Sequence, residues 1–347
     1  MAGHGRQGTA GRDGRLSAHG ALYGAVDLGT HNCRLLIAGA DGQRGLRVVD
    51  AVSSAARLGE GLAGSGRLKP AAMDRAIAAL ARFQRRMSRL GVARARAVAT
   101  EACRSAANRA EFLDRVLAET GMELQPISPA EESGLTLAGC APLLDPARPR
   151  TLLFDIGGGS TEAIWVEQGH EDGIPRIRDL LSLPAGVLTL SERLNCGDGA
   201  ADRLRRTGDA LDGALADFDD RHGIARALGD GGIQVIGTSG TVTTLAAVLL
   251  GLRRYRRALV DGVEVDFGRI AALCRDLAGS DRATRAALPC VGPERADLLG
   301  VGCAILAALH RRWPAERLTV ADRGIREGIL LRMLAEEAAS PAADPRP

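Results

Sequence analysis

The chain has 347 residues, of which 46% are hydrophobic and 3% aromatic, and 45 basic against 42 acidic side chains leave a net charge of +3. The length predicts two domains, the hydrophobic content excludes a wholly disordered chain, and the nearly balanced charge argues against a protein that binds nucleic acid. Lys69 is the only lysine, so any phosphate clamp must use arginine, hydroxyl groups or backbone N–H groups.

The two ends of the chain lack the features of targeting or membrane segments. Residues 1–20 are rich in glycine, arginine and histidine without an apolar core, and we expect a disordered tail there and a second loose tail at 338–347. No apolar run reaches the roughly 18 residues of a membrane span. The seven cysteines are scattered and never spaced C-x-x-C, which is typical of a reducing compartment. We therefore expect a cytoplasmic protein that contacts no membrane.

Strand and helix signals alternate along the first part of the chain. Residues 23–41 predict two strands joined by a polar turn that contains glycine. Pro70 opens an amphipathic helix that stops at Gly91. A second helix follows Asn108, which we expect to form a capping box with Glu111.

The strand–turn–strand pattern returns after a linker at residues 145–150. AVDLGTHNCRLLIAG around Asp27 and LFDIGGGSTEAIWVE around Asp155 share one plan, in which apolar residues, an aspartate, a glycine and a hydroxyl residue precede a second apolar strand. The aspartates are 155 − 27 = 128 residues apart, a domain-sized spacing. Because helices separate the strands, this predicts an α/β protein with two similar domains, 21–145 and 150–322, whose turns face a shared cleft.

The glycine-containing turns carry groups that bind anions. Gly157–Thr161 combines successive backbone N–H groups with two hydroxyl donors, and a third glycine turn lies at Gly237–Thr241. Asp155 and Glu162 flank the first of these segments. Since carboxylates repel phosphate, we expect them to hold a divalent cation that in turn binds phosphate. The alternative is an ordinary hairpin whose carboxylates face water.

Other phosphate-binding and nucleophile motifs are absent from the sequence. There is no G-x-x-x-x-G-K-[ST] motif, which excludes a P-loop NTPase, and the glycine triplet leads into a strand where a dinucleotide fingerprint needs a helix. No G-x-S-x-G motif is present. Two features stay open: Glu131–Glu132 is either part of a site or a helix N-terminal charge effect, and Arg104 is either a phosphate clamp or a surface residue.

Four segments, in order, resemble the Ppx/GppA phosphatases, which are exopolyphosphatases and guanosine pentaphosphate phosphohydrolases. They are VDLGTHNCRLLI, AVATEACRSAANRAEFL, ISPAEESGLTLAG and FDIGGGSTE, and GTSGTVTTL and DRGIREGILL fit the closing segments of the family. The resemblance implies two ribonuclease-H-like domains of the actin-like and sugar-kinase-like superfamily around a central cleft. It also implies a C-terminal helix, at about 323–337, that packs back on the first domain.

The resemblance further implies the reaction and its residues. The family hydrolyses a terminal phosphoanhydride with Mg²⁺, other divalent cations being an alternative, and the position of Glu132 gives it the role of general base. The implied metal ligands are Asp27, Asp155 and Glu162. The implied phosphate-binding residues are Thr30, His31, Asn32, Arg104, Gly157, Gly158, Gly159, Ser160, Thr161, Gly237, Ser239, Gly240 and Thr241. A metal, N–H donors and one base are a sufficient set for such hydrolysis.

The sequence departs from the family pattern at two positions. His31 stands in the first turn where the family commonly has a neutral amide, and we expect it to alter substrate preference or to make phosphate binding depend on pH. Gly134 stands where an arginine is usual, which implies a cleft with one arginine fewer.

The sequence leaves the substrate open. The first expectation is an exopolyphosphatase that acts on inorganic polyphosphate, and the alternative is a guanosine pentaphosphate phosphohydrolase with a role in the stringent response. An ATP-dependent kinase or a non-catalytic nucleotide-binding regulator of the same superfamily is a weaker alternative. The regulator is disfavoured because Glu132, Asp155 and Glu162 are all present. The resemblance also implies a homodimer, since family members often dimerise.

Overall fold

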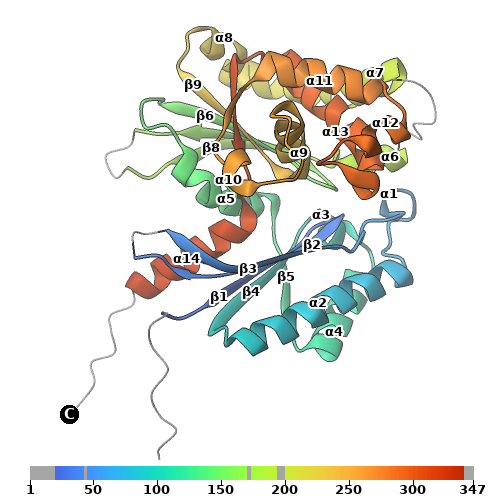
Figure 1. The fold of residues 1–347 in the computed structure, drawn as a ribbon, viewed down its shortest axis with the longest axis vertical. Helices are drawn as coiled ribbons and strands as arrows, with labels where there is room; N and C mark the ends of the chain where they lie inside the picture. Colours follow the sequence, from blue (N-terminus) through green and yellow to red (C-terminus); the bar gives the residue numbers. More distant parts are fainter. Residues whose placement is uncertain (1–19, 43–44, 170–172, 194–199, 340–347) are drawn as a thin grey trace, which may run out of the picture.

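Two β-sheets with helices packed on their faces organise the protein in the computed structural model, which describes residues 20–42, 45–169, 173–193 and 200–339 (Figure 1). The tails predicted at 1–20 and 338–347 lie almost wholly outside the described residues. The α/β class is confirmed, with one sheet in each half of the molecule.

The first sheet is built from five strands of the described chain: β1 (Tyr23–Leu28), β2 (Asn32–Ala40), β3 (Leu46–Ala55), β4 (Arg94–Ala99) and β5 (Leu124–Pro126). Their order is β3-β2-β1-β4-β5. β1 pairs antiparallel with β2 through a tight turn and parallel with β4, so Asp27 lies between Arg34 and Val98 in the sheet. The turn after β1 therefore lies at the carboxyl end of β1, beside the carboxyl end of the parallel strand β4.

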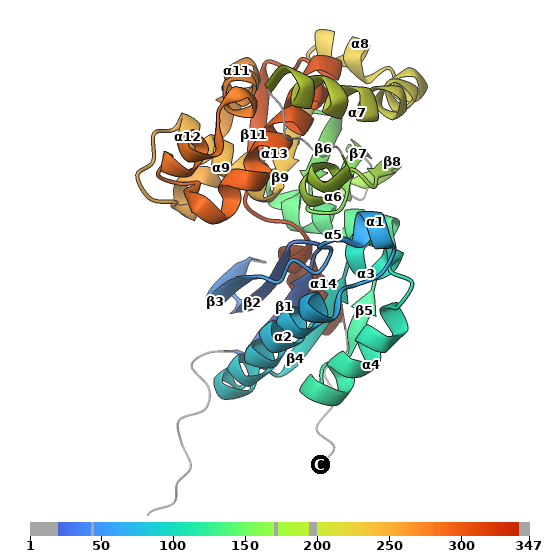
Figure 2. The same cartoon turned by 90° about the vertical axis from the view of Figure 1, so that its right-hand side faces the viewer.

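Helices α2 (Pro70–Leu90) and α4 (Arg109–Thr120) cover one face of this sheet, and the short α1 (Leu62–Ser65) and α3 (Glu101–Ser105) lie near its upper edge (Figure 2). The predicted start of α2 at Pro70 and its stop at Gly91, where φ is 68°, are confirmed. The predicted capping box is wrong. The Asn108 side chain instead accepts a hydrogen bond of 2.8 Å from the backbone N–H of Leu68, which ties two loops together.

The second sheet is built from six strands of the described chain: β6 (Arg150–Ile156), β7 (Thr161–Glu167), β8 (Arg176–Leu183), β9 (Ile233–Thr238), β10 (Glu264–Asp266) and β11 (Arg317–Ala321). Their order is β10-β11-β9-β6-β7-β8. β6 pairs antiparallel with β7 and parallel with β9, as β1 does with β2 and β4. The internal repeat predicted from Asp27 and Asp155 is therefore a repeat of strand pairing.

Eight helices of the described chain surround this second sheet (Figures 1 and 2). They are α6 (Val187–Arg193), α7 (Ala200–His222), α8 (Ile224–Gly229), α9 (Ser239–Leu249), α10 (Arg257–Val260), α11 (Phe267–Gly279), α12 (Arg282–Ala287) and α13 (Gly292–Arg312). Phe154, Trp165, Phe218, Phe267 and Trp313 are buried in the core that they enclose. Among the described residues, no helix has both the length and the apolar character needed to cross a membrane.

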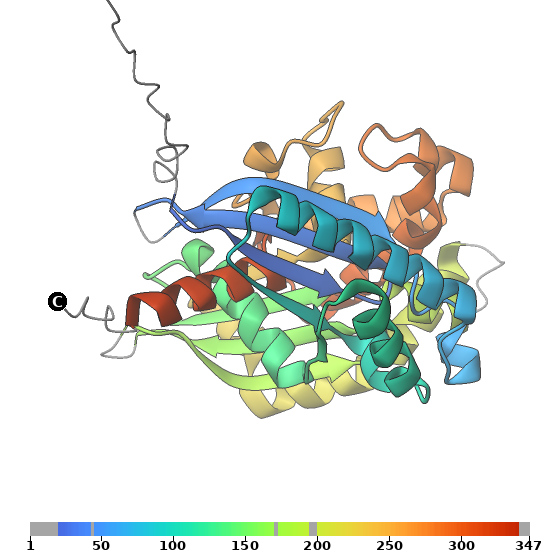
Figure 3. The same ribbon diagram turned by 90° about the horizontal axis from the view of Figure 1, so that it is seen from below.

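Two helices lie between the two sheets, α5 (Pro129–Cys140) and α14 (Ile325–Ala339) (Figures 1 and 3). Helix α5 continues into a 3₁₀ turn at Ala141–Leu143. Leu135 packs in one cluster with Leu330 of α14 and residues of the first sheet, which confirms that the C-terminal helix returns to the first domain. Cys140 packs against the second sheet. A Cβ at Gly328 would lie 1.9 Å from the carbonyl oxygen of Leu135, so the helices meet backbone to backbone. Helix α5 thereby belongs to both cores.

Candidate active site

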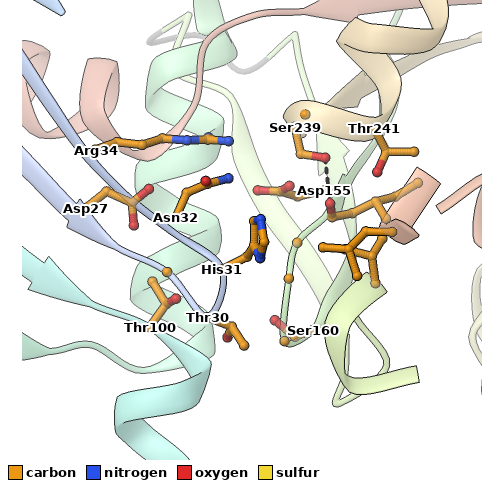
Figure 4. Close-up of a pocket in the computed structure, with 18 of the residues that line it drawn as sticks. Asp27, Thr30, His31, Asn32, Arg34, Thr100, Asp155, Ser160, Ser239 and Thr241 are labelled. Atoms are coloured by element: carbon orange, nitrogen blue, oxygen red, sulfur yellow. Dashed lines mark hydrogen bonds between the residues drawn. The ribbon is translucent and has the colours of Figure 1, made fainter. Parts of the chain in front are cut away.

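A cleft of about 320 Å³ lies where the turns of the two sheets meet (Figure 4). The β1–β2 turn forms one wall, and the β6–β7 turn and the start of α9 form the opposite wall. The cleft is lined by thirteen of the predicted site residues: Asp27, Thr30, His31, Asn32, Glu132, Asp155, Gly157, Gly158, Gly159, Ser160, Ser239, Gly240 and Thr241. Residues more than 200 positions apart in the chain are thus brought to one place.

The glycine triplet is required for close contact between the domains. A Cβ at Gly159 would lie 2.2 Å from Oγ1 of Thr30, and one at Gly158 would lie 3.0 Å from Cβ of His31. No glycine of the triplet has a positive φ, so space, and not backbone conformation, is what excludes a larger residue here. The two repeated turns therefore touch at the floor of the cleft.

The carbonyl groups of the triplet face α6. The N–H of Val187 donates to Gly157 O at 3.0 Å and the N–H of Leu188 donates to Gly158 O at 2.8 Å. Carbonyl and N–H groups of a trans peptide point in opposite directions, so the N–H groups of Gly158 and Gly159 point away from α6. These donors are positioned to bind an anion in the cleft.

Four carboxyl groups with raised pKa values converge at the junction of the domains. Burial raises the pKa of Asp27, and it raises the pKa of Asp155 to about 6. Burial and the charge of Asp155 together raise the pKa of Glu162 to about 8. Burial, then the charge of Glu162, raises the pKa of Glu132 well above its usual value, and Arg104 acts against this rise. Four carboxyl groups that are buried close together favour either protonation or the binding of a cation.

Arg104 contacts the proposed base without lining the cleft. Its Nη1 donates to Oε2 of Glu132 at 3.1 Å and to the carbonyl oxygen of Ile127 at 2.7 Å, and its Nη2 pairs with Glu101 at 2.5 Å. Glu131 points elsewhere and pairs with Arg96. Glu132 of the acidic pair therefore faces the cleft, whereas Glu131 does not. Arg104 is not a surface residue, and its guanidinium group is already engaged by protein partners.

Three other predicted residues lie outside the cleft lining. The Thr161 hydroxyl is buried and donates to the carbonyl oxygen of Ala185 at 2.8 Å, and a Cβ at Gly237 in β9 would lie 2.7 Å from the Phe154 ring. Neither residue is among those that line the cleft. Glu162 is buried beneath the lining, where it accepts a hydrogen bond of 2.8 Å from Ser182. The expected roles of these three residues as phosphate or metal contacts stay predictions.

The two departures from the family pattern also have structural outcomes. A Cβ at Gly134 would lie 2.9 Å from the guanidinium group of Arg332 in α14, and Gly134 is not among the lining residues, so the expected effect of the missing arginine stays a prediction. Burial and the charges of Arg57 and Arg34 lower the pKa of His31 to about 4. The imidazole is therefore neutral near pH 7, and the predicted pH-dependent binding through His31 is not expected in that range.

Sequence reasoning missed the cationic lining of the cleft. Arg34 lies two residues after Asn32 on β2, so the period of the strand puts both side chains on one face, and this signal was available in the sequence. Arg295 comes from α13, far along the chain, and nothing local to it marks the site. Together they give the cleft two guanidinium groups suited to phosphate oxygens.

The described residues contain unpaired polar atoms at this site. Oδ1 of Asp27, Oγ1 of Thr30 and Nδ1 of His31 are buried there without a hydrogen-bond partner. Buried polar groups normally have partners, so three orphans in one cleft point to a ligand. Among the described residues, no group of three or more His, Cys, Asp and Glu side chains is arranged to hold a metal by itself.

The fold and the cleft define a class of protein: a two-domain α/β protein of the actin-like arrangement, with anion-binding groups at the domain junction. The profile of the Ppx/GppA phosphatase family matches residues 36–337. Exopolyphosphatase 2 of Mycobacterium tuberculosis is 32% identical over 328 residues, which cover 89% of this chain and 97% of that protein. The chain belongs to the Ppx/GppA phosphatase family, and it is an enzyme, a phosphoanhydride hydrolase.

Solved structures agree with this assignment. The Ppx/GppA family member of Aquifex aeolicus is 27% identical with a TM-score of 0.74, and the match covers 92% of this chain and 99% of that one. An exopolyphosphatase from Cytophaga hutchinsonii is 26% identical with a TM-score of 0.79, and the match covers 91% and 98% of the two chains. The similarity thus spans both domains and the cleft between them.

Proposed function

We propose that the chain is an exopolyphosphatase, which releases the terminal phosphate of inorganic polyphosphate by attack of water. The observation that carries the proposal is that Glu132 and the Gly157–Ser160 turn line the same cleft. One supplies a base and the other supplies N–H donors for the phosphoryl group, which are the two elements that phosphoryl transfer to water requires.

In the proposed reaction, Glu132 removes a proton from the attacking water. The water oxygen forms a bond to the terminal phosphorus, and the bridging P–O bond breaks, so that the shortened chain leaves with the bridging oxygen. The raised pKa of Glu132 suits a general base, because proton transfer is most effective when the pKa of the base lies near the working pH. Arg104 keeps the carboxylate in place.

The terminal phosphoryl group is proposed to bind at the floor of the cleft, beside the unpartnered hydroxyl of Thr30. The N–H groups of Gly158 and Gly159 and the hydroxyl of Thr30 face it from the floor of the cleft, and Arg34 and Arg295 neutralise its charge. Donors fixed before the substrate arrives stabilise the charge that develops during transfer.

Mg²⁺ is proposed as the cofactor, with Asp27 and Asp155 as its protein ligands. Both carboxylates line the cleft, and Oδ1 of Asp27 has no partner among the described residues. Two carboxylates fit Mg²⁺, which usually keeps several waters and takes further ligands from substrate phosphates. Bound there, the ion would supply charge neutralisation for the phosphoryl group. Glu162 then acts indirectly, through its charge on Glu132.

The lining of the cleft favours polyphosphate over guanosine pentaphosphate. The only aromatic ring among the described residues that line the cleft is the imidazole of His31, and no Phe, Tyr or Trp is there to stack on a guanine base. Arg34, Arg295 and several hydroxyl groups instead suit a run of phosphates.

The test is phosphate release from long polyphosphate, tripolyphosphate and guanosine pentaphosphate, measured side by side with Mg²⁺ present. We expect kcat/KM for the polyphosphates to exceed that for the nucleotide. A higher value for guanosine pentaphosphate would contradict the proposed substrate, and release from none of the three would contradict the proposed function.

A further inference from the structure

A second hollow of about 200 Å³ adjoins the cleft on the side where the chain passes from β11 into α14. It shares Asp27, Arg34, Asp155 and Arg295 with the cleft, so the two spaces are continuous. Its lining also contains Tyr255, Arg323 and Arg326, together with the acidic residues Asp322 and Glu327. A chain of phosphates that begins at the reacting centre therefore has a path toward Tyr255.

Tyr255 lies in the middle of an arginine-rich segment, Arg253–Arg257, which reads RRYRR and leads into α10. Figure 1 shows α10 on the side of the second domain that faces the first. The Tyr255 hydroxyl donates to Asp322 at 2.7 Å, and Arg257 pairs with Glu327 at 2.8 Å. Both partners lie at the passage into α14, so the segment is anchored beside the second hollow.

The other three arginines of the segment are exposed, and they form no ion pair within the described residues: Arg253, Arg254 and Arg256. Some exposed arginines elsewhere do pair with acidic residues, for example Arg205 with Asp202 and Arg282 with Asp297. Three unpaired guanidinium groups that flank Tyr255 in the chain create a positive field in this part of the molecule, next to a residue that lines the hollow. Such a field attracts a polyanion.

We propose that Arg253, Arg254 and Arg256 bind the phosphates of a long polyphosphate chain beyond those held in the cleft and the second hollow. This inference rests on the proposed function, and it adds a preference for chain length. Each internal phosphate carries a negative charge, so contact with three arginines releases counterions and strengthens binding without touching the reacting end. A short chain ends before it reaches the segment.

The experiment compares the wild-type enzyme with the variant Arg253→Ala/Arg254→Ala/Arg256→Ala, on tripolyphosphate and on long-chain polyphosphate. We expect the KM for the long chain to rise about tenfold, because exposed ion pairs each contribute modestly. The slope of log KM against log salt concentration should become shallower by roughly two, since three phosphate contacts are lost. The constants for tripolyphosphate should not change, which also shows that the variant is folded.

The matched control is Arg85→Ala/Arg89→Ala/Arg269→Ala, which removes the same charge from exposed positions on α2 and α11. These helices lie on the outer faces of the two domains (Figure 1). We expect this control to keep the wild-type KM for the long chain. An equal rise in KM in the control would assign the effect to net charge and overturn the proposal.

Two other outcomes would overturn the inference. The first is an unchanged KM for long polyphosphate in the Arg253→Ala/Arg254→Ala/Arg256→Ala variant. The second is that the wild-type enzyme binds RNA and this variant does not, while the polyphosphate kinetics of the two are the same. The wild-type enzyme releasing no phosphate from either polyphosphate would overturn the proposed function, and this inference with it. Release with equal KM in both variants overturns this inference alone.

Discussion

Arg104 and Glu132 form a shielded ion pair at the wall of the cleft, with Nη1 of the arginine 3.1 Å from Oε2 of the glutamate and only 18% and 8% of their side chains exposed. The arginine is fixed by Glu101 and the carbonyl group of Ile127, both in the first domain. Glu132 belongs to α5, which packs on both sheets. The orientation of the proposed base therefore depends on the junction of the domains.

Replacing Glu132 by glutamine should remove the general base while it keeps the shape of the side chain. We expect kcat for phosphate release from polyphosphate to fall roughly 100- to 10,000-fold, the contribution typical of general base catalysis. The matched control is Glu131→Gln, because that neighbour pairs with Arg96 outside the cleft and should leave kcat within about twofold. A Glu132→Gln enzyme with near-wild-type turnover would sink the assignment of the base.

Replacing Arg104 by glutamine should shift the pH dependence of kcat/KM. Arg104 stabilises the ionised form of Glu132 and so lowers its pKa, and without it the pKa rises further. The carboxylate then becomes ionised only at higher pH, and the acidic limb of the profile should move to higher pH. Arg104→Lys keeps the charge and should shift the limb less. A lower rate with an unmoved limb would indicate instead that Arg104 binds phosphate.

Without a divalent cation, stability should fall as the pH rises from about 4 toward 8, because the folded protein then binds more protons than the unfolded chain. The responsible groups are Asp155, whose pKa is raised to about 6, and Glu162, whose pKa is raised to about 8. The contribution of each group to the free energy of unfolding is lost once the pH exceeds the pKa of that group in the folded protein. Thermal unfolding followed by circular dichroism across this range measures the effect, and stability that rises with pH would contradict it.

Mg²⁺ should raise the melting temperature more at about pH 8 than at about pH 5, since a cation binds the ionised carboxylates and stabilises the state that it binds. The double variant Asp27→Asn/Asp155→Asn should abolish this increase in melting temperature. The measurement requires no assay of activity. A Mg²⁺-induced increase that persists in the double variant would show that the ion binds elsewhere.

Replacing Gly159 by alanine should destabilise the contact between the two turns. The added Cβ would lie 2.2 Å from Oγ1 of Thr30, so a side chain or the turn must move, at a cost of about 1–3 kcal/mol in the free energy of unfolding. Gly213→Ala in α7 is the control, because nothing lies within 4 Å of its Cβ position and alanine favours a helix. Urea unfolding measures both, and a stable Gly159→Ala protein with full activity would contradict the close contact.

Much of the fold was predictable because its signals are local. The proline and glycine that bound α2 and the repeated plan around Asp27 and Asp155 act through neighbours in the chain. The Asn108 capping box failed because a tertiary partner, the backbone of Leu68, took the side chain that a local rule assigned to the helix. Gly157–Gly159 were recognised, but the reason for them, contact with Thr30 and His31, is not a property of their own segment.

The sequence by itself determined the α/β class, the duplicated strand pairs, the family and most residues of the two turns, since these follow from periodicity and from motifs read along the chain. Only the tertiary structure decided which of these groups face one another. It placed Arg34 and Arg295 in the cleft, Thr161 and Glu162 beneath it, and Arg104 on Glu132. The physical reason is that burial, and with it each pKa, depends on contacts between segments that the order of residues does not bring together.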